Sequence, residues 1–104
     1  MNLEWSDQAI DSLRETARYI GQSFGVKARV RFRQEVHYVE GLLREHPHLG
    51  APEPFLANRP LLYRSVVVGH LNKIVYRVLD DRIEIVDFWD TRREPQAQAG
   101  EVKE

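Results

Sequence analysis

Apolar residues recur at helical spacing in the first part of the chain. Ser6 and Asp7 are typical of a helix start, because a serine side chain caps free amides and an acid suits the positive end of the helix. The stripe that follows predicts a buried face made of Ile10, Leu13, Ala17 and Ile20. Gly21, followed by Gly25, predicts the end of this helix and a tight turn.

A second and longer helix is predicted from Val26 to His46, where Pro47 ends it. Its apolar positions are Ala28, Phe32, Val36, Val39 and Leu43. Its first turns carry four cations, Lys27, Arg29, Arg31 and Arg33. Each exposed cation costs about 0.3–1 kcal/mol at this end of a helix dipole. Two interpretations remain open: a solvated face, or contact with an acidic partner or phosphates.

The rest of the chain is patterned as strands. Residues 47–60 contain several prolines and predict an irregular link. Residues 61–68, 71–79 and 82–90 are rich in Val, Ile, Tyr and Leu and predict an antiparallel meander with two-residue turns. Leu3, Glu4 and Trp5 predict an added edge strand. The fold class is therefore α+β, a β-α-α-β-β-β domain over residues 1–95 with two helices on one face of a small antiparallel sheet, and residues 96–104 are expected to be a flexible tail.

Two-residue turns would fix the register and so the two faces of the meander. The face under the helices is then predicted to hold Tyr63, Ser65, Val67, Ile74, Tyr76, Val78, Ile83, Ile85 and Trp89. The other, open face is predicted to hold Arg64, Val66, Lys73, Val75, Arg77, Glu84, Val86 and Phe88, extended by Arg92. We expect Arg77 to pair with Glu84 across the strands, and Arg64 and Lys73 to be exposed. Such a face either serves solubility or binds an anion such as a phosphate backbone or an acidic peptide.

Composition and charge narrow the function classes. The 104 residues contain no cysteine, which excludes disulfides and thiol catalysis, and the net charge of -1 is not that of a typical nucleic-acid binder. The basic residues are nevertheless unevenly distributed along the chain, since residues 54–79 contain four of them and no acidic residue. The four histidines form no metal-ligand pattern, so we expect neither a metal nor a cofactor. The N-terminus lacks the features of a signal peptide, and a cytoplasmic protein without a membrane segment is expected.

The order of these elements and several short motifs resemble the RelE/ParE superfamily of bacterial toxins from type II toxin-antitoxin systems. The resemblance covers almost the whole chain. Its carriers are Trp5-Ser6 with Ala9, residues 17–20, His46-Pro47 with Gly50, residues 63–69, residues 73–78, and residues 83–86 leading into 90–95. The resemblance implies a growth inhibitor that is neutralised by a cognate antitoxin, in a possible hetero-oligomer of the two proteins.

Two activities occur among the toxins that this chain resembles. RelE-like members cleave messenger RNA on the ribosome with basic residues of the sheet and often a tyrosine near the C-terminus, whereas ParE-like members inhibit DNA gyrase. Carried over to this chain, Arg64, Lys73 and Arg92 are the catalytic candidates of a nuclease, and the same residues with Arg77 and Arg93 are candidates for binding the target or an anion. Val66 stands where RelE has a second lysine, and no tyrosine follows Arg93. The missing tyrosine and the near-neutral net charge slightly favour ParE-like inhibition; the alternatives are a RelE-like nuclease and a non-toxic module that only binds the antitoxin.

Overall fold

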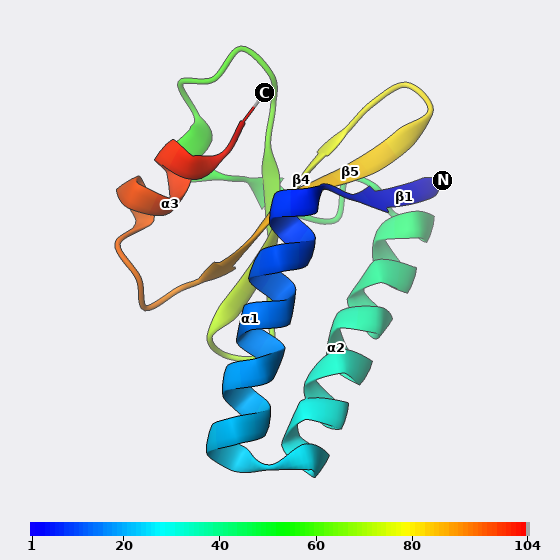
Figure 1. The fold of residues 1–104 in the computed structure, drawn as a ribbon. Helices are drawn as coiled ribbons and strands as arrows, with labels where there is room; N and C mark the ends of the chain where they lie inside the picture. The colour runs from blue at the N-terminus through cyan, green and yellow to red at the C-terminus, as the bar shows by residue number, and fades with distance from the viewer. Residues whose placement is uncertain (104) are drawn as a thin grey trace.

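The computed structural model describes residues 1–103, and Figure 1 traces their path. Strand β1 (Asn2–Trp5) leads into helices α1 (Asp7–Phe24) and α2 (Val26–Glu45), which form an antiparallel hairpin. A short strand β2 (Ala51–Pro52) and a 3-10 helix η1 (Pro54–Leu56) follow. Strands β3 (Arg64–Val68), β4 (Asn72–Val78) and β5 (Arg82–Asp90) and helix α3 (Pro95–Glu101) complete the fold. The predicted α+β class is confirmed, and the predicted β-α-α-β-β-β order is present with one additional strand, β2, and one additional helix, α3.

The helical hairpin follows the sequence pattern closely but its first helix is longer than predicted. The Ser6 hydroxyl accepts a hydrogen bond from the Ala9 backbone N–H and caps α1, as expected. The helix does not end near Gly21 but runs on to Phe24. Gly25, with φ +96°, both ends α1 and precedes α2, so a single residue in a conformation that favours glycine makes the turn.

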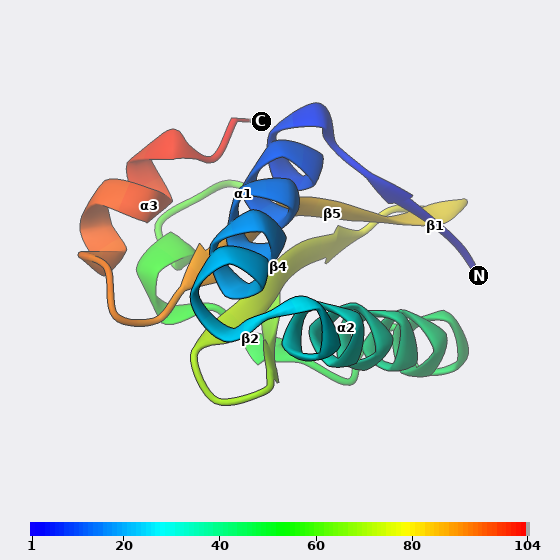
Figure 2. The ribbon, with the colours of Figure 1, turned by 60° about the horizontal axis from the view of Figure 1, so that its bottom comes forward.

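The five strands form one sheet in the order β1-β5-β4-β3-β2, in which only the β1–β5 pair is parallel. The predicted edge strand is confirmed as β1. Two elements fall in the link that was predicted to be irregular: β2 pairs with the start of β3, and η1 follows it. Figures 1 and 2 place α3 at the end of the molecule opposite to β1.

Two local irregularities overturn part of the predicted faces. Val68 pairs with Asn72, so the first turn has three residues, 69–71, instead of two, and every side chain of β3 is on the opposite face from the prediction. The second turn has two residues as predicted, because Leu79 donates its N–H to the Arg82 carbonyl. In β5, a bulge at Val86 exchanges the faces of the residues that follow it.

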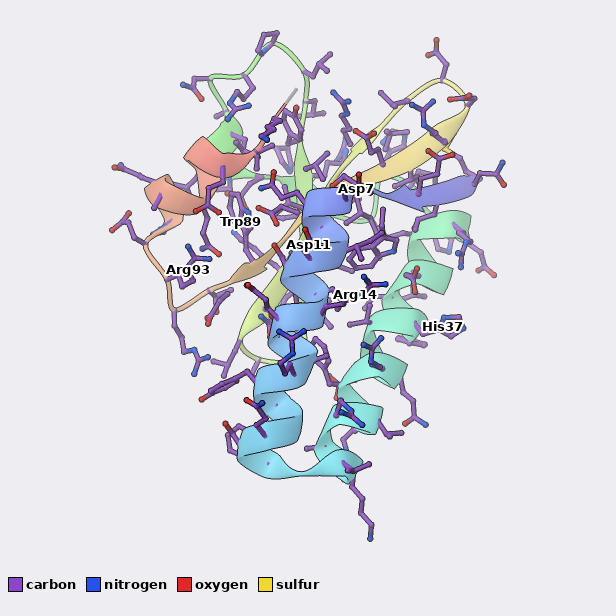
Figure 3. All side chains as sticks on the ribbon, viewed as in Figure 1. Asp7, Asp11, Arg14, His37, Trp89 and Arg93 are labelled. Atoms are coloured by element: carbon purple, nitrogen blue, oxygen red, sulfur yellow. The ribbon has the colours of Figure 1, made fainter. Side chains whose placement is uncertain are left out.

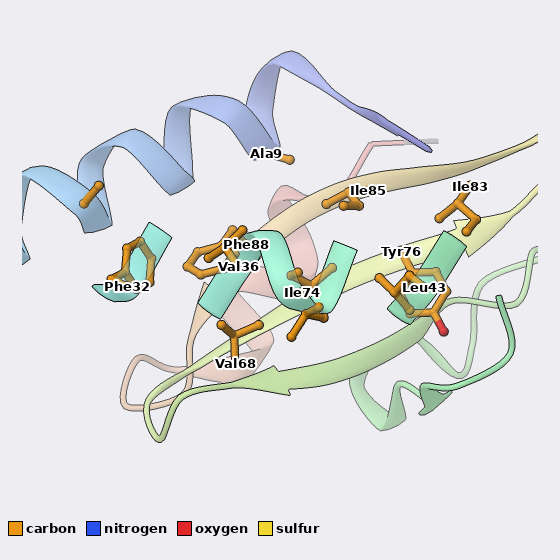
Figure 4. Close-up of a cluster of buried hydrophobic side chains, with 12 residues drawn as sticks. Ala9, Phe32, Val36, Leu43, Val68, Ile74, Tyr76, Ile83, Ile85 and Phe88 are labelled. Carbon is orange, nitrogen blue, oxygen red and sulfur yellow. The ribbon is translucent and has the colours of Figure 1, made fainter. Parts of the chain in front are cut away.

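Each face of the sheet therefore carries its own buried cluster. The first cluster lies between the sheet and the hairpin and is drawn in Figure 4; its strand residues are Val68, Ile74, Tyr76, Ile83, Ile85 and Phe88. The second cluster lies on the other face and consists of Leu56, Tyr63, Val75, Val86, Trp89, Ala99 and Val102. Two of its members come from residues 96–104, which we had expected to be a flexible tail. Residues 95–101 are helical instead, because Ala99 and Val102 bury their side chains against the strands.

Candidate functional site

Lys73 lies on the face of the sheet that α3 and η1 cover, and its charge is balanced within the chain. Its ammonium group forms an ion pair with the Glu53 carboxylate, whose side chain is 0% exposed. The same carboxylate accepts hydrogen bonds from the Ser65 hydroxyl at 2.9 Å and the Phe55 N–H at 2.9 Å. The ammonium also lies 5.2 Å from the centre of the Trp89 ring. Lys73 is therefore a structural cation and not the exposed group that the sequence predicted.

Arg64 lies on the opposite face from Lys73 and also has a structural partner. Its Nη1 donates to the Gly50 carbonyl at 2.8 Å. Across the strands it pairs with Tyr76, whose hydroxyl accepts from the Gly50 N–H and donates to the Pro47 carbonyl, both at 2.8 Å. Burial raises the pKa of Tyr76, although the hydrogen bond from Gly50 and the charge of Arg64 oppose that shift. Tyr76 faces the core, as predicted, and these contacts attach the segment after α2 to the sheet.

Arg77 pairs with Glu84, as the sequence predicted. The Arg77 Nε donates to the Glu84 Oε1 at 2.8 Å, and the Nη2 of Arg77 lies at the same distance from that oxygen. Because their side chains are only 16% and 23% exposed, the pair is held mostly out of solvent. The positive charge of Arg77 is therefore largely compensated by Glu84.

Arg92 and Arg93 follow β5 and are the exposed members of the predicted set, with side chains 54% and 56% exposed. Arg92 makes a two-point contact with Asp90, from Nε to Oδ1 and from Nη2 to Oδ2, each at 3.1 Å. The hydrogen bond from Arg92 lowers the pKa of the Asp90 carboxyl, and in return the bond to Asp90 raises the pKa of Arg92. Arg93 reaches Glu101 of α3 at 3.4 Å.

Both arginines line a groove of about 430 Å³ between α1 and the end of β5. Its apolar lining includes three side chains that are 44–69% exposed, those of Tyr19, Phe24 and Leu71. Tyr19 and Phe24 contact each other edge to face, with ring centres 6.3 Å apart. Figure 3 labels Arg93 on the segment between β5 and α3. This groove joins an exposed apolar surface to two guanidinium groups, a combination typical of protein interaction sites.

The structure does not bring the predicted site residues together on one face. The three-residue turn separates Arg64 from Lys73 and Arg77, and Arg92 lines a groove on the hairpin side instead of extending the open face. The supposed open face is itself partly covered, since η1 and α3 pack on it. The prediction of one continuous cationic floor was therefore wrong.

Sequence reasoning missed a buried carboxylate beside this groove. Asp87 is 2% exposed and accepts hydrogen bonds from Ser12 and Gln8 of α1 and from the Trp89 indole. The sequence did carry a signal for it, namely an acidic residue inside a strand of apolar residues. An acidic residue in such a position is rarely buried unless it has hydrogen-bond partners.

Within residues 1–103, no group of three or more His, Cys, Asp or Glu side chains has an arrangement that suits a metal ion. No helix in that part of the chain is long and apolar enough to cross a membrane.

Comparison with known proteins decides the family. The model of the ParE toxin of the type II toxin-antitoxin system, parDE, matches residues 3–95. The chain belongs to the ParE toxin family. This match confirms the resemblance stated from the sequence, and membership of a toxin-antitoxin family implies an antitoxin as partner.

Solved structures agree with the fold of this ParE-family toxin. The chromosomal ParDE toxin-antitoxin system from P. aeruginosa superposes with a TM-score of 0.70 at 19% identity, over 86% of this chain and 95% of that one. The YoeB dimer from Staphylococcus aureus gives a TM-score of 0.57 at 23% identity, over 84% and 92% of the two chains. The search of curated proteins found no match.

Proposed function

We propose that this toxin arrests growth by binding and inhibiting DNA gyrase, as its ParE-like features imply, and that it does not cleave RNA. One observation carries the proposal. The three catalytic candidates of a nuclease, Arg64, Lys73 and Arg92, lie in three different settings, and each already binds a group of its own chain. Stabilising a phosphate during cleavage needs cations that converge on one point and are aimed at the developing charge.

The missing tyrosine supports the same conclusion. Losing a general acid or base typically costs about 100-fold to 10,000-fold in rate. Tyr76 is a poor replacement because it is 0% exposed and its hydroxyl is engaged by Pro47 and Gly50. An inhibitor that works by binding needs only a complementary surface. In this proposal the groove that Arg92 and Arg93 line contacts the target.

The test uses the purified toxin in two assays run side by side. In the first, gyrase supercoils relaxed plasmid with increasing toxin; in the second, ribosomes translate a defined messenger whose ends are then mapped. We expect loss of supercoiling and intact messenger. Arg92→Glu with Arg93→Glu should weaken inhibition, whereas the control Arg44→Glu, an exposed cation of α2 outside the groove, should not.

Two results would overturn the proposal. Ribosome-dependent cleavage with unaffected supercoiling would assign the chain to the RNA-cleaving branch. No effect in either assay, together with harmless expression in the absence of antitoxin, would identify a module that binds the antitoxin without being toxic. Pulse labelling after induction provides the matching observation in cells, since inhibition of gyrase should stop DNA synthesis before protein synthesis.

A further inference from the structure

Positive charge gathers on the first two turns of α2, next to the turn of the helical hairpin. The basic residues there are Lys27, Arg29, Arg31 and Arg33, and residues 16–34 contain no acid. All four are exposed, and within residues 1–103 none of them forms an ion pair. Figure 1 shows the hairpin turn at the end of the molecule that points away from the sheet. This end of the molecule is therefore positive and uncompensated.

The cations of the sheet have a different environment. Lys73, Arg77 and Arg92 each form an ion pair with a carboxylate of this chain. Helix α2, by contrast, has no acid in its first turn, and no side chain caps it at Gly25. Cations near a helix N-terminus are unfavourable, and like charges four residues apart repel each other. Helix stability therefore gives no reason for the four basic residues, whereas an anionic partner does.

The four cations lie on two opposite flanks of α2. Each residue of an α-helix is turned by about 100° from the one before it. Lys27 and Arg31 therefore share one flank, and Arg29 and Arg33 share the other. The second flank faces α1, because a Cβ added to Gly21 of α1 would lie 3.3 Å from the Arg29 Cδ.

The first flank lies toward the turn between β3 and β4. Glu35 follows Arg31 by one helical turn, and a Cβ added to Gly69 of that turn would lie 3.1 Å from the Glu35 Oε2. Between the two flanks, Val30 and Gln34 are exposed and form the middle of the outer side of the helix. We call this surface the basic face; it consists of Lys27, Arg29, Val30, Arg31, Arg33 and Gln34.

The basic face matches the major groove of duplex DNA in width and in charge. A helix with its side chains is about 10–12 Å across, and the major groove is about 12 Å wide with a phosphate backbone along each side. Cations on both flanks meet both backbones at once, and Val30 and Gln34 are small enough to let the helix approach. An acidic helix of another protein offers one row of charges and would meet only one flank.

The net charge of the chain does not count against a nucleic-acid partner. Its value of -1 is an average over two unlike regions. Residues 80–104 contain eight acids and four bases, whereas residues 16–34 contain five bases and no acid. Such a separation of charge orients the positive end toward a polyanion and keeps the negative region away from it.

We propose that the basic face of α2 binds the phosphate backbones of duplex DNA, with the helix lying in the major groove. This proposal goes beyond the inhibition of gyrase and does not depend on it. Binding should be nearly independent of base sequence, because phosphate contacts carry no sequence information. It would hold the toxin on the DNA that gyrase handles and leave the groove lined by Arg92 and Arg93 free for a protein.

The experiment measures binding of the purified toxin to a labelled duplex of about 20 base pairs by fluorescence anisotropy, between about 0.05 M and 0.2 M salt. Four phosphate contacts predict that the logarithm of the association constant falls with the logarithm of the salt concentration at a slope of about -3.6. Lys27→Gln with Arg31→Gln removes two contacts. The slope should then change to about -1.8, and the affinity at about 0.1 M salt should fall by roughly 60-fold. Arg29→Gln with Arg33→Gln should give the same loss on the other flank.

Two controls accompany these variants. Arg44→Gln removes an exposed cation near the other end of α2 and should leave the slope unchanged. Circular dichroism checks folding: glutamine is about as good a helix former as lysine or arginine, and fewer like charges at the helix start should not lower the melting temperature. An RNA duplex of the same sequence should bind more weakly, because its major groove is too deep and narrow for a helix.

Three results would overturn the proposal. The first is no binding of the unmodified toxin to DNA at about 0.05 M salt. The second is an unmodified slope in both flank variants. The third is equal or tighter binding to the RNA duplex, which would show that the helix does not enter the major groove. The supercoiling assay is separate: a toxin that binds DNA in this way without inhibiting gyrase would sink the proposed function alone.

Discussion

Replacing Lys73 with methionine should destabilise the toxin strongly, because the change removes the counter-charge of a buried acid. The Glu53 side chain is 0% exposed, and the remaining donors to it, the Ser65 hydroxyl and the Phe55 N–H, are neutral. Breaking a buried ion pair by deleting one partner costs about 3–5 kcal/mol. Because the Lys73 side chain is 19% exposed, water partly replaces it, and we expect about 3 kcal/mol. At about 4–8 °C per kcal/mol for a domain of this size, the melting temperature should fall by roughly 12–24 °C.

Urea unfolding followed by circular dichroism measures this loss. Arg92→Met is the matched control, because its pair with Asp90 is exposed and should contribute less than about 1 kcal/mol. Adding Glu53→Gln to Lys73→Met removes the stranded charge and should recover a large part of the lost stability. If the free energy of unfolding of Lys73→Met lies within about 0.5 kcal/mol of that of the unmodified toxin, the structural assignment of Lys73 is wrong. A role in binding an external anion then becomes the better explanation.

Three further predictions concern the contacts around β4 and β5. Tyr76→Phe leaves the Gly50 N–H and the Pro47 carbonyl unpaired and should lower the free energy of unfolding, measured in urea, by about 1–3 kcal/mol. Because burial raises the pKa of Tyr76 above 10.0, the unmodified protein should lose the stability that Tyr76 contributes as the pH rises from the unfolded-state pKa through the folded-state pKa, and the Phe variant should not. An equal loss of stability at alkaline pH in both proteins would contradict this. Gly50→Ala would put a Cβ 2.6 Å from the Ser65 carbonyl oxygen, so we expect a loss of about 1–3 kcal/mol, and a melting temperature unchanged by the alanine would show that the segment yields freely. Arg92→Gln should raise the pKa of Asp90 toward its ordinary value in a carbon-detected NMR titration, whereas an unmoved titration would mean that Arg92 does not hold that carboxyl.

The fold was predictable where the periodic pattern and the local signals agreed. The Ser6 cap, the two amphipathic stripes and the β-rich runs each pointed to the element that forms. The register of the strands was not predictable, since the insertion of a single residue changes it. A loop of three residues in place of two after Val68, and one extra residue at Val86, each exchange the two faces of a strand while the alternating pattern stays the same.

The prediction of the candidate site was wrong because of the changed register and because one ion-pair partner could not be foreseen. Once β3 is turned over, Arg64 leaves the face that holds Lys73, so the predicted floor divides. The partner of Lys73 was also invisible in the sequence, because Glu53 lies in a proline-rich link where an acid looks like a solvated loop residue. Only the pairing of Arg77 with Glu84 survived, since a two-residue turn links their strands.

The parallel pairing of β1 with β5 has a consequence for how the toxin is made. Asn2 pairs with Arg82 and Trp5 with Ile85, so one edge of the sheet joins segments from the two ends of the chain. Contacts between such distant segments form late, after the cost of closing a long loop has been met. The ribosome adds about 5–20 residues each second, so β1 has no partner for the first several seconds of synthesis. The sheet is complete only when nearly the whole chain has emerged, and an unfinished toxin cannot present its final surfaces.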